Sequence, residues 1–382
     1  MHHAMRDEPI LDEAAAPHPS AARQPPVPDA GEQPGPADRA ALFSVLTGGW
    51  IAQACYALAK LGVPDLLADG PRGVEELAAD CAADVRALHR TLGALAAVGL
   101  LRRTAPRTYA LTGATRLLCS TTRDSAGPTA VMFGEEVHRA FGDVLHTLRT
   151  GSPAFPHTHG ASFYDYLADH PEAAATFNTA MGSTDVPTAL ARCDLSRLGT
   201  LVDVGGGEGR LLAAVLKRRP GARGVLVELP ETLVNARKRL ADAGCAQRVD
   251  FVAGSFFDAG VVPAGGDIYT LSRVLHNWDD SEALTILRAV RGAIGPDGRL
   301  LVLERLEELD EADPGRPPGR REAQAKLIDL LMLVMVEGYD RTLEQYRALL
   351  GEAGFAVRAV HRAPLHAAGA ECAIEAVPAP PG

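Results

Sequence analysis

No long block of basic residues occurs in this chain of 382 residues, whose formal net charge is −10. Without such a block a protein lacks the positive surface that holds phosphates, so we expect no nucleic-acid partner. No apolar run approaches the roughly 18 residues of a membrane span, and the N-terminus has no cationic start followed by an apolar core. These absences predict a cytoplasmic protein with no membrane partner.

Closely spaced cysteines are also absent. The six cysteines form no C-x-x-C pair and are scattered along the chain at Cys55, Cys81, Cys119, Cys193, Cys245 and Cys372. Scattered thiols of this kind are typical of proteins in a reducing compartment and form neither a disulfide framework nor a zinc site. We therefore predict free thiols and no metal ion.

The N-terminal third of the chain predicts a disordered tail and a small domain. Residues 1–37 are rich in proline, alanine and charge and hold almost no large apolar residue, which is typical of disorder. Over 38–125, helical apolar spacing is followed by two short amphipathic stretches and "RRTAPRTYALT", which predicts a two-stranded wing around Pro106. A winged-helix domain binds DNA or forms a dimer. Its second helix offers only Arg86, His89 and Arg90 to a phosphate backbone, so the dimer is favoured.

The remaining chain divides into two regions. Residues 126–199 have helical periodicity, with aromatic and methionine residues gathered in them. From 200 to 382, short β-rich runs alternate with helical runs, beginning with "TLVDVGG" and "GRLLAAVLKRRPG". This alternation predicts an α/β domain with a doubly wound, mostly parallel sheet. Ligands of such sheets bind beyond the carboxyl ends of the strands.

A glycine cluster follows the first of these strands, in "LVDVGGGEGR". The dinucleotide pattern G-x-G-x-x-G fails because position 210 is Arg210, and no G-K-S/T sequence is present to form a P-loop. Glu228 closes the next strand, where a carboxylate can accept both hydroxyls of a ribose. Asp203 precedes the loop and suits a cationic ligand better than a pyrophosphate. The pattern favours an adenosine ligand without pyrophosphate, such as S-adenosylmethionine.

Three further segments end strands at the same expected crevice. In "GSFFD", Ser255 could hydrogen-bond an adenine while Phe256 packs on its face. In "SRVLHNWDD", His276 follows a strand at the position that suits a general base. Glu304 ends another strand, and Asp340 follows an apolar helix that contains methionines.

These segments, together with "VLVELPETL", "GPDGRLLVLE" and "DLLMLVMVEGYDRTLEQYRALLGEAGF", resemble the caffeate-type, S-adenosylmethionine-dependent O-methyltransferases. The resemblance is stronger to the bacterial branch that modifies aromatic secondary metabolites, and it covers about residues 40 to 378. It implies a class I methyltransferase domain, an N-terminal dimerisation domain and an intertwined homodimer. It also implies a small aromatic acceptor, of the aromatic polyketide type.

The resemblance also assigns site residues. His276 matches the base, Glu304 matches one flanking acid, and Asp340 occupies the second acidic position with a shorter side chain than the family's glutamate. Cofactor contacts are implied at Asp203, Gly205, Gly207, Glu228, Leu229, Gly254, Ser255, Phe256, Ser272 and Arg273. Ser272 stands where a lysine is often found. Acceptor contacts are implied at Phe163, Tyr166, Phe177, Met181, Asn277, Trp278, Met332 and Met335.

The predicted reaction is methyl transfer to a phenolic hydroxyl. A phenol with a pKa of about 10 is mostly protonated at neutral pH, so a neutral histidine that takes the proton accelerates attack by a factor of ~10² to 10⁴. Such a reaction requires no metal. Two other classes stay open: a methyltransferase-fold enzyme that methylates carbon or nitrogen or assists a hydroxylation, and a winged-helix regulator that binds a ligand.

Overall fold

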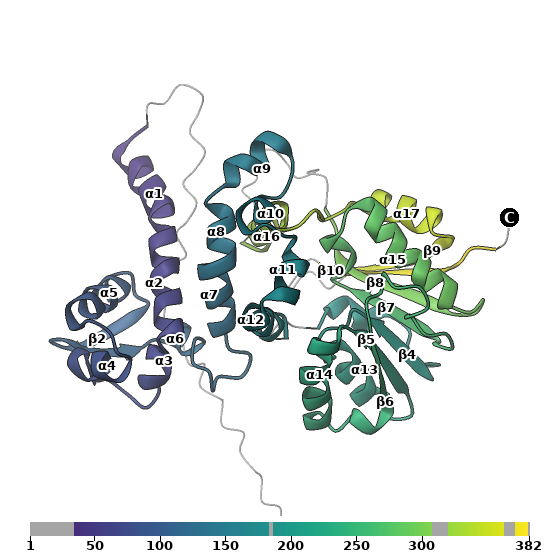
Figure 1. The fold of residues 1–382 in the computed structure, drawn as a ribbon, viewed down its shortest axis with the longest axis horizontal. Helices are drawn as coiled ribbons and strands as arrows, with labels where there is room; N and C mark the ends of the chain where they lie inside the picture. The colour runs from purple at the N-terminus through teal and green to yellow at the C-terminus, as the bar shows by residue number, and fades with distance from the viewer. Residues whose placement is uncertain (1–33, 183–185, 308–319, 363–370, 381–382) are drawn as a thin grey trace, which may run out of the picture.

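The computed structural model describes residues 34–182, 186–307, 320–362 and 371–380. Figure 1 shows three parts in a row: a small N-terminal domain, a group of helices in the middle, and a larger domain built on a sheet. The predicted tail over 1–37 lies outside the described residues as far as residue 33. Helix α1 begins at Pro36, a few residues earlier than the apolar spacing predicts.

The N-terminal domain has the predicted winged-helix order. Strands β2 (Leu101–Ala105) and β3 (Thr108–Leu111) pair antiparallel and form the wing, whose tight turn places Arg107 at a φ of 60°. A short strand that the sequence did not indicate, β1 (Arg72–Gly73), adds to β3. The helices are α1 (Pro36–Leu46), α2 (Gly48–Lys60), α3 (Val63–Leu66), α4 (Val74–Asp80), α5 (Val85–Ala97) and α6 (Gly113–Arg116).

Helices α1 and α2 correct one step of the sequence argument. Together they form a helical stretch over Pro36–Lys60 that is long and apolar enough, by length and composition, to cross a membrane. The statement that no segment reaches that length is therefore wrong. This stretch leaves large apolar side chains exposed on the described chain, among them Leu42, Phe43, Leu46 and Trp50. An exposed apolar surface of this kind marks a contact with a protein partner or with a membrane.

The middle region is helical, as predicted, but its helices are short. A π-helical turn (Phe133–Val137) interrupts the segment between α7 and α8. At this turn Gly134 lies so close to α2 that a Cβ there would be 2.1 Å from the ring of Tyr56. The helices are α7 (Gly127–Met132), α8 (His138–Phe141), α9 (Val144–Thr150), α10 (Ala154–His159), α11 (Phe163–Asp169) and α12 (Pro171–Gly182), followed by a 3-10 turn (Thr188–Arg192).

The C-terminal domain is the predicted doubly wound fold. Its seven-stranded sheet has the order β6-β5-β4-β7-β8-β10-β9, and only the pairings of β10 with β8 and with β9 are antiparallel. The strands are β4 (Thr200–Val204), β5 (Arg223–Glu228), β6 (Val249–Ala253), β7 (Ile268–Ser272), β8 (Arg299–Arg305), β9 (Phe355–Arg362) and β10 (Glu371–Pro378). Helices α13 (Arg210–Arg218), α14 (Pro230–Asp242), α15 (Asp280–Ala293) and α17 (Leu343–Glu352) cover the sheet, as Figure 1 shows.

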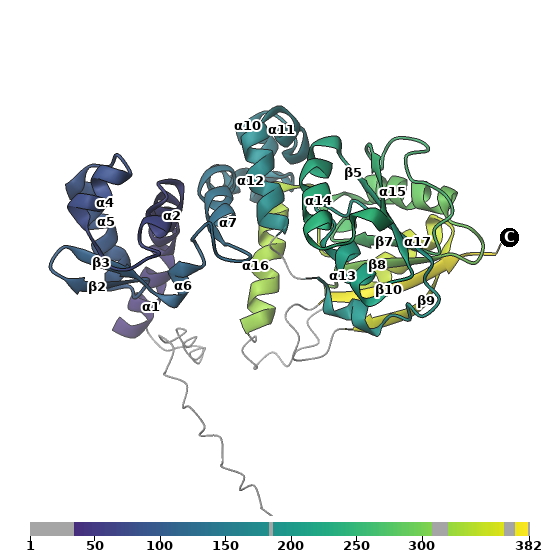
Figure 2. The ribbon, with the colours of Figure 1, turned by 90° about the horizontal axis from the view of Figure 1, so that it is seen from below.

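Two details of this domain position the site. The run "DIYTLSRVLH" predicts one strand, but β7 ends at Ser272 because Arg273 has a φ of 56°, and a 3-10 turn (Leu275–Asn277) follows. Helix α16 (Arg320–Met335) lies outside the sheet domain, in the middle region (Figure 2), where it packs against α8, α9 and α10. The segment after α16 brings the chain back to the sheet through Asp340 and Arg341, and so links the two parts.

Candidate active site

A short turn after β7 carries the predicted base. His276 lies in the 3-10 turn Leu275–Asn277, directly beyond the carboxyl end of a central parallel strand. The side chain is only 12% exposed, and its Nδ1 has no hydrogen-bond partner within 3.5 Å among the described residues. Asn277 Nδ2 donates to the Arg273 carbonyl at 3.1 Å, which closes the turn. The backbone therefore fixes where the imidazole lies.

Glu304, at the end of β8, anchors that turn from one side. Its Oε1 accepts from three consecutive backbone N–H groups, those of Val274 at 3.0 Å, Leu275 at 2.9 Å and His276 at 3.4 Å. Its Oε2 lies 3.7 Å from His276 Nδ1, the distance of an ion pair rather than of a hydrogen bond. Burial raises the pKa of this carboxyl, although the nearby His276 opposes the shift. One oxygen thus holds the backbone while the other faces the ring.

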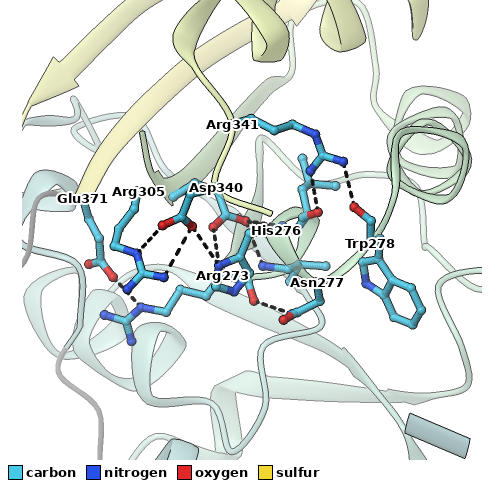
Figure 3. A network of polar contacts seen from close by, with 11 residues as sticks. Arg273, His276, Asn277, Trp278, Arg305, Asp340, Arg341 and Glu371 are labelled. Atoms are coloured by element: carbon cyan, nitrogen blue, oxygen red, sulfur yellow. Dashed lines mark hydrogen bonds and ion pairs between the residues drawn. The ribbon is translucent and has the colours of Figure 1, made fainter. Parts of the chain in front are cut away.

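Asp340 approaches the same ring nitrogen from the loop after α16. Its Oδ1 lies 3.6 Å from His276 Nδ1, and its Oδ2 lies 3.1 Å from Arg305 Nε (Figure 3). Burial by itself would raise the pKa of Asp340, but His276 and Arg305 outweigh it and hold that pKa below its ordinary value. Asp340 therefore keeps its negative charge beside the imidazole. Its role as the second flanking acid, in place of the family's longer glutamate, stays a prediction.

Arg341 holds the turn from its opposite side, and the sequence analysis did not single it out. Its guanidinium is completely buried and donates to the carbonyls of Leu275 at 2.8 Å and Trp278 at 2.7 Å (Figure 3). Its Nε donates to Asp280 Oδ1 at 2.9 Å. The signal was present in the sequence, because Arg341 follows Asp340 in "EGYDRT".

Gly338 makes the close approach of this loop possible. A Cβ added at this position would lie 2.1 Å from the His276 carbonyl oxygen and 2.4 Å from the Trp278 nitrogen. Only a residue without a side chain fits against the backbone there. The segment 338–341 therefore packs directly on the turn that carries His276.

The glycine loop after β4 has the shape of a cradle for a ligand. Gly205 and Gly207 have φ values of 66° and 56°, in the left-handed region that favours glycine. A Cβ on Gly205 would lie 3.0 Å from Val274 and 3.1 Å from the Phe256 ring. Phe256 and Val274, in the turn before His276, therefore both lie close against the glycine loop at Gly205.

Two acids line this cradle. Asp203 is fully buried, its Oδ1 accepts from Thr270 at 2.7 Å, and its Oδ2 has no partner among the described residues. Burial raises the pKa of Asp203 to about 6. Glu228 accepts from the N–H groups of Gly207 at 2.9 Å and Leu229 at 2.8 Å, and burial raises its pKa as well. Both carboxylates can accept further hydrogen bonds. They fit S-adenosylmethionine, which offers ribose hydroxyls and a positively charged ammonium and sulfonium.

The other predicted cofactor residues are distributed around this place. Gly254 donates its N–H to the Glu228 carbonyl at 3.1 Å, so the "GSFFD" turn lies beside the acid as expected. The Ser255 hydroxyl accepts from the Phe257 N–H at 3.2 Å. The guanidinium of Arg273 is directed to Glu371 of β10, with Nε 2.5 Å from Oε1 (Figure 3). Contacts of Ser272 and Arg273 with the cofactor stay predictions.

Aromatic side chains from α11 and α12 meet the site residues. Tyr164 stacks on Trp278 with ring centroids 5.0 Å apart and planes 23° apart. Phe177 packs edge-on against Phe163 and Tyr164, at 5.1 and 6.3 Å. The Phe257 ring touches Trp278 at 4.8 Å. An aromatic wall thus runs from the middle helices to the loop that carries His276.

The structure separates the predicted acceptor contacts. Tyr166 stacks on His170 with centroids 3.8 Å apart and packs edge-on against Phe155, so Tyr164 and not Tyr166 reaches Trp278. Met332 and Met335 are buried in the same apolar cluster as Phe163, and Met181 is 40% exposed. Helical spacing alone did not tell which tyrosine of "FYDY" faces the site. The acceptor contacts of these residues stay predictions.

All six cysteines are free, as the scattered spacing predicts. Metal ligands are a separate question, because two groups of acids and histidines in the described chain are close enough to hold an ion. They are Asp143, His146 and His157, and Asp279, Glu282 and Glu337. Neither group includes His276.

Comparison with known proteins agrees with this geometry. An O-methyltransferase domain model matches residues 140–356, and an O-methyltransferase dimerisation domain model matches residues 43–121. The phenazine O-methyltransferase PhzM of Lysobacter antibioticus is 41% identical over 322 residues, which are 84% of this chain and 91% of that protein. The 8-amino-8-demethylriboflavin N,N-dimethyltransferase of Streptomyces davaonensis is 38% identical over 321 residues, 82% of this chain and 89% of that protein.

A similar solved structure contains S-adenosylmethionine. The O-methyltransferase NcsB1 of neocarzinostatin biosynthesis, in complex with S-adenosylmethionine and 2-hydroxy-5-methyl naphthoic acid, superimposes with a TM-score of 0.72 at 33% identity. The match covers 86% of this chain and 95% of that one. With its winged-helix dimerisation domain, its Rossmann-like sheet and its glycine cradle, this chain belongs to the S-adenosylmethionine-dependent O-methyltransferase family.

Proposed function

We propose that this enzyme transfers a methyl group to a phenolic hydroxyl of a planar aromatic secondary metabolite, with His276 as the general base. The observation that carries the proposal is the placement of His276 Nδ1 between two carboxylates, 3.7 Å from Glu304 and 3.6 Å from Asp340. An imidazole whose Nδ1 faces two carboxylates carries its proton on Nδ1. Its other ring nitrogen, Nε2, is then free to accept a proton.

The residues of the cradle divide the work of binding. Glu228 would accept the ribose hydroxyls, Phe256 would pack on the adenine, and Asp203 would face the cationic amino-acid portion. Bound S-adenosylmethionine supplies a methyl group on a positively charged sulfur, which needs little assistance as a leaving group. The acceptor oxygen is the atom that the protein must activate.

His276 Nε2 takes the hydroxyl proton as the oxygen attacks. The resulting imidazolium is stabilised by Asp340, whose negative charge the Arg305 ion pair preserves. Glu304 contributes mainly by fixing the backbone of the turn. The remaining acceleration comes from alignment of the reacting atoms, because oriented reactants recover much of the entropy of a bimolecular encounter.

The acceptor is proposed to be flat and polycyclic. Tyr164 and Trp278 stack on each other. A planar acceptor would stack on one of these two rings in place of the other ring. Phe163, Phe177 and the buried methionines Met332 and Met335 would supply the apolar surround. We assign to Tyr164 the acceptor contact that was expected of Tyr166, because Tyr164 is the tyrosine that stacks on Trp278.

The wider organisation belongs to the same proposal. The exposed apolar face of α1 and α2 would form the contact of a homodimer in the cytoplasm, within a domain of residues 38–125. Residues 126–199 would line the acceptor site, and residues 200–382 would bind the cofactor. Transfer to nitrogen is the second candidate, because one relative is named as an N,N-dimethyltransferase.

The test compares His276→Gln with the matched control His138→Gln, at an exposed histidine of α8. Turnover would be measured on phenols of graded pKa and on an arylamine series, and binding of S-adenosylhomocysteine by calorimetry. We expect turnover of His276→Gln to fall by ~10² or more, with unchanged cofactor affinity and a smaller loss on more acidic phenols.

Two outcomes would contradict the proposal. If the folded His276→Gln protein turned over phenols within a few fold of wild type, His276 would not be the base. If arylamines were methylated and every phenol were inert, the acceptor atom would be nitrogen. In both cases, wild-type turnover by the control His138→Gln shows that the assay itself is sound.

A further inference from the structure

The turn between α9 and α10 brings together one carboxylate and two imidazoles outside the active site. Asp143 precedes α9, His146 lies in the first turn of that helix, and His157 lies on α10. Gly151, with a φ of 76°, ends α9 and allows the chain to reverse. One ligand atom from each of the three side chains lies within 4.8 Å of the other two.

The Asp143 carboxylate is used in an unusual way. An aspartate at the position before a helix normally accepts a hydrogen bond from the N–H groups of the first turn. Asp143 makes no such bond, and its Oδ2 instead lies 2.6 Å from His157 Nδ1. The rings of His146 and His157 stack with centroids 4.3 Å apart and planes 10° apart. All three polar groups therefore converge on one place.

We propose that Asp143, His146 and His157 bind a divalent transition-metal ion. Two imidazoles and one carboxylate are the donor set of zinc, nickel and copper sites, whereas magnesium and calcium prefer oxygen ligands throughout. Tetrahedral bonds of about 2.0 Å place neighbouring ligand atoms about 3.3 Å apart. To reach that spacing, Asp143 Oδ2 and His157 Nδ1, now 2.6 Å apart, separate slightly, and the His146 ring leaves its parallel stack on His157. The exposed His157 and the half-buried His146 and Asp143 leave room for these side-chain rotations.

Binding rearranges one proton. His157 Nδ1 becomes a ligand once the proton that it shares with Asp143 has moved to Nε2 or to solvent. Three protein ligands leave the fourth position of the metal to water. The ion clips α9 to α10, and both helices pack against α16, the helix that leads to the Asp340 loop. The metal ion therefore has a structural role in the middle region and takes no part in methyl transfer.

The three ligands come from one short segment, residues 143–157. A salt bridge or a ring stack alone also explains part of this geometry, because Asp143 and His157 form a hydrogen bond without any ion. The two explanations differ in their response to added metal. Only a metal site predicts that a stoichiometric ion raises the melting temperature, since a ligand that binds only the folded state stabilises it.

The experiment uses the full chain, stripped with EDTA and dialysed at pH 7.5. Titration with ZnCl₂ in a calorimeter and thermal unfolding with and without zinc are the two readouts. Titration with CoCl₂ reports the ligands, because cobalt bound to cysteine shows a thiolate charge-transfer band and cobalt bound to nitrogen and oxygen does not. We expect one tight equivalent, a raised melting temperature and no thiolate band, while MgCl₂ has no effect.

The variants are His146→Ala with His157→Ala, compared with the control His138→Ala. The double variant is expected to lose the tight equivalent and the zinc-dependent rise in melting temperature, whereas the control keeps both. A wild-type protein without a tight equivalent would overturn the proposal. So would a double variant that keeps it, or a thiolate band at one equivalent, since each of these places the ion elsewhere.

Discussion

Removal of the Arg341 guanidinium is the sharpest test of how His276 is held in place. In Arg341→Met the side chain keeps its approximate length but loses its bonds to the carbonyls of Leu275 and Trp278 and to Asp280. A hydrogen bond from a charged group contributes about 1.5 to 3 kcal/mol, but the Asp280 carboxylate is 61% exposed and regains water. The two carbonyls therefore dominate, and we expect a loss of about 3 to 4 kcal/mol in unfolding free energy.

The catalytic effect follows from displacement rather than from lost chemistry. Arg341 makes no contact with a reacting atom and acts as a positioning residue for His276. A misplacement of about 1 Å costs on the order of 10²-fold in turnover. We expect kcat to fall by about that factor, with the loss larger for weakly acidic phenols, while the Kd for S-adenosylhomocysteine changes by less than about two-fold.

Urea denaturation, calorimetry and initial rates on the phenol series measure these three quantities. Arg288→Met is the matched control, because the Arg288–Glu352 ion pair is exposed on both sides and contributes little. Arg341→Lys keeps the charge with fewer donors, and we expect it to fall between wild type and Arg341→Met; it also serves if the methionine variant does not fold. A folded Arg341→Met enzyme with wild-type kcat would refute the reasoning.

Three further predictions follow from close contacts and burial. Gly338→Ala places a methyl group against the His276 carbonyl. We expect the unfolding free energy to fall by about 1 to 3 kcal/mol and kcat to fall with it, and both defects to be larger in Gly338→Val. A fully active Gly338→Val enzyme would contradict this prediction. The pKa of Asp203 is raised in the folded state, so its favourable contribution is complete below its unfolded pKa and is lost as pH rises to about 6. Asp203→Asn therefore stabilises the cofactor-free protein by about 2 to 3 kcal/mol at pH 8 and much less at pH 4, and equal unfolding curves for the two proteins at pH 8 argue against this. Trp50→Glu on the exposed face of α2 is expected to shift the molar mass in light scattering from dimer toward monomer, and an unchanged dimer mass would remove that face from the interface.

Much of the fold was visible in the sequence because its signals are local. The glycines after β4 and the alternation of apolar strands and amphipathic helices predicted the sheet domain, and "RRTAPRTYALT" predicted the wing. The length of β7 was overestimated because one residue, Arg273, turns the chain with a positive φ that an arginine rarely adopts. The antiparallel pairing of β10 depends on contacts between segments far apart in the chain, which no local pattern contains.

The site was predictable where residues follow strands and less so where helices supply it. His276 and Glu304 lie at strand ends, so their meeting follows from the sheet alone. The choice between Tyr164 and Tyr166 depends on how α11 is rotated against the rest of the molecule, which a short helix with aromatic residues on several faces does not specify. Arg341 was missed because a charged residue is normally expected at the surface.

The base and the acceptor wall are held by different stretches of the chain. Glu304 of β8 holds the turn around His276 from one side, and Gly338 and Arg341 of the segment after α16 pack on it from the other. The aromatic rings that meet this turn come from α11 and α12. Under the proposed function, a substitution in those helices changes the surface offered to the acceptor and leaves the hydrogen bonds of the turn intact. Acceptor preference and the position of His276 are then set by separate parts of the chain, so one can be altered while the other is kept.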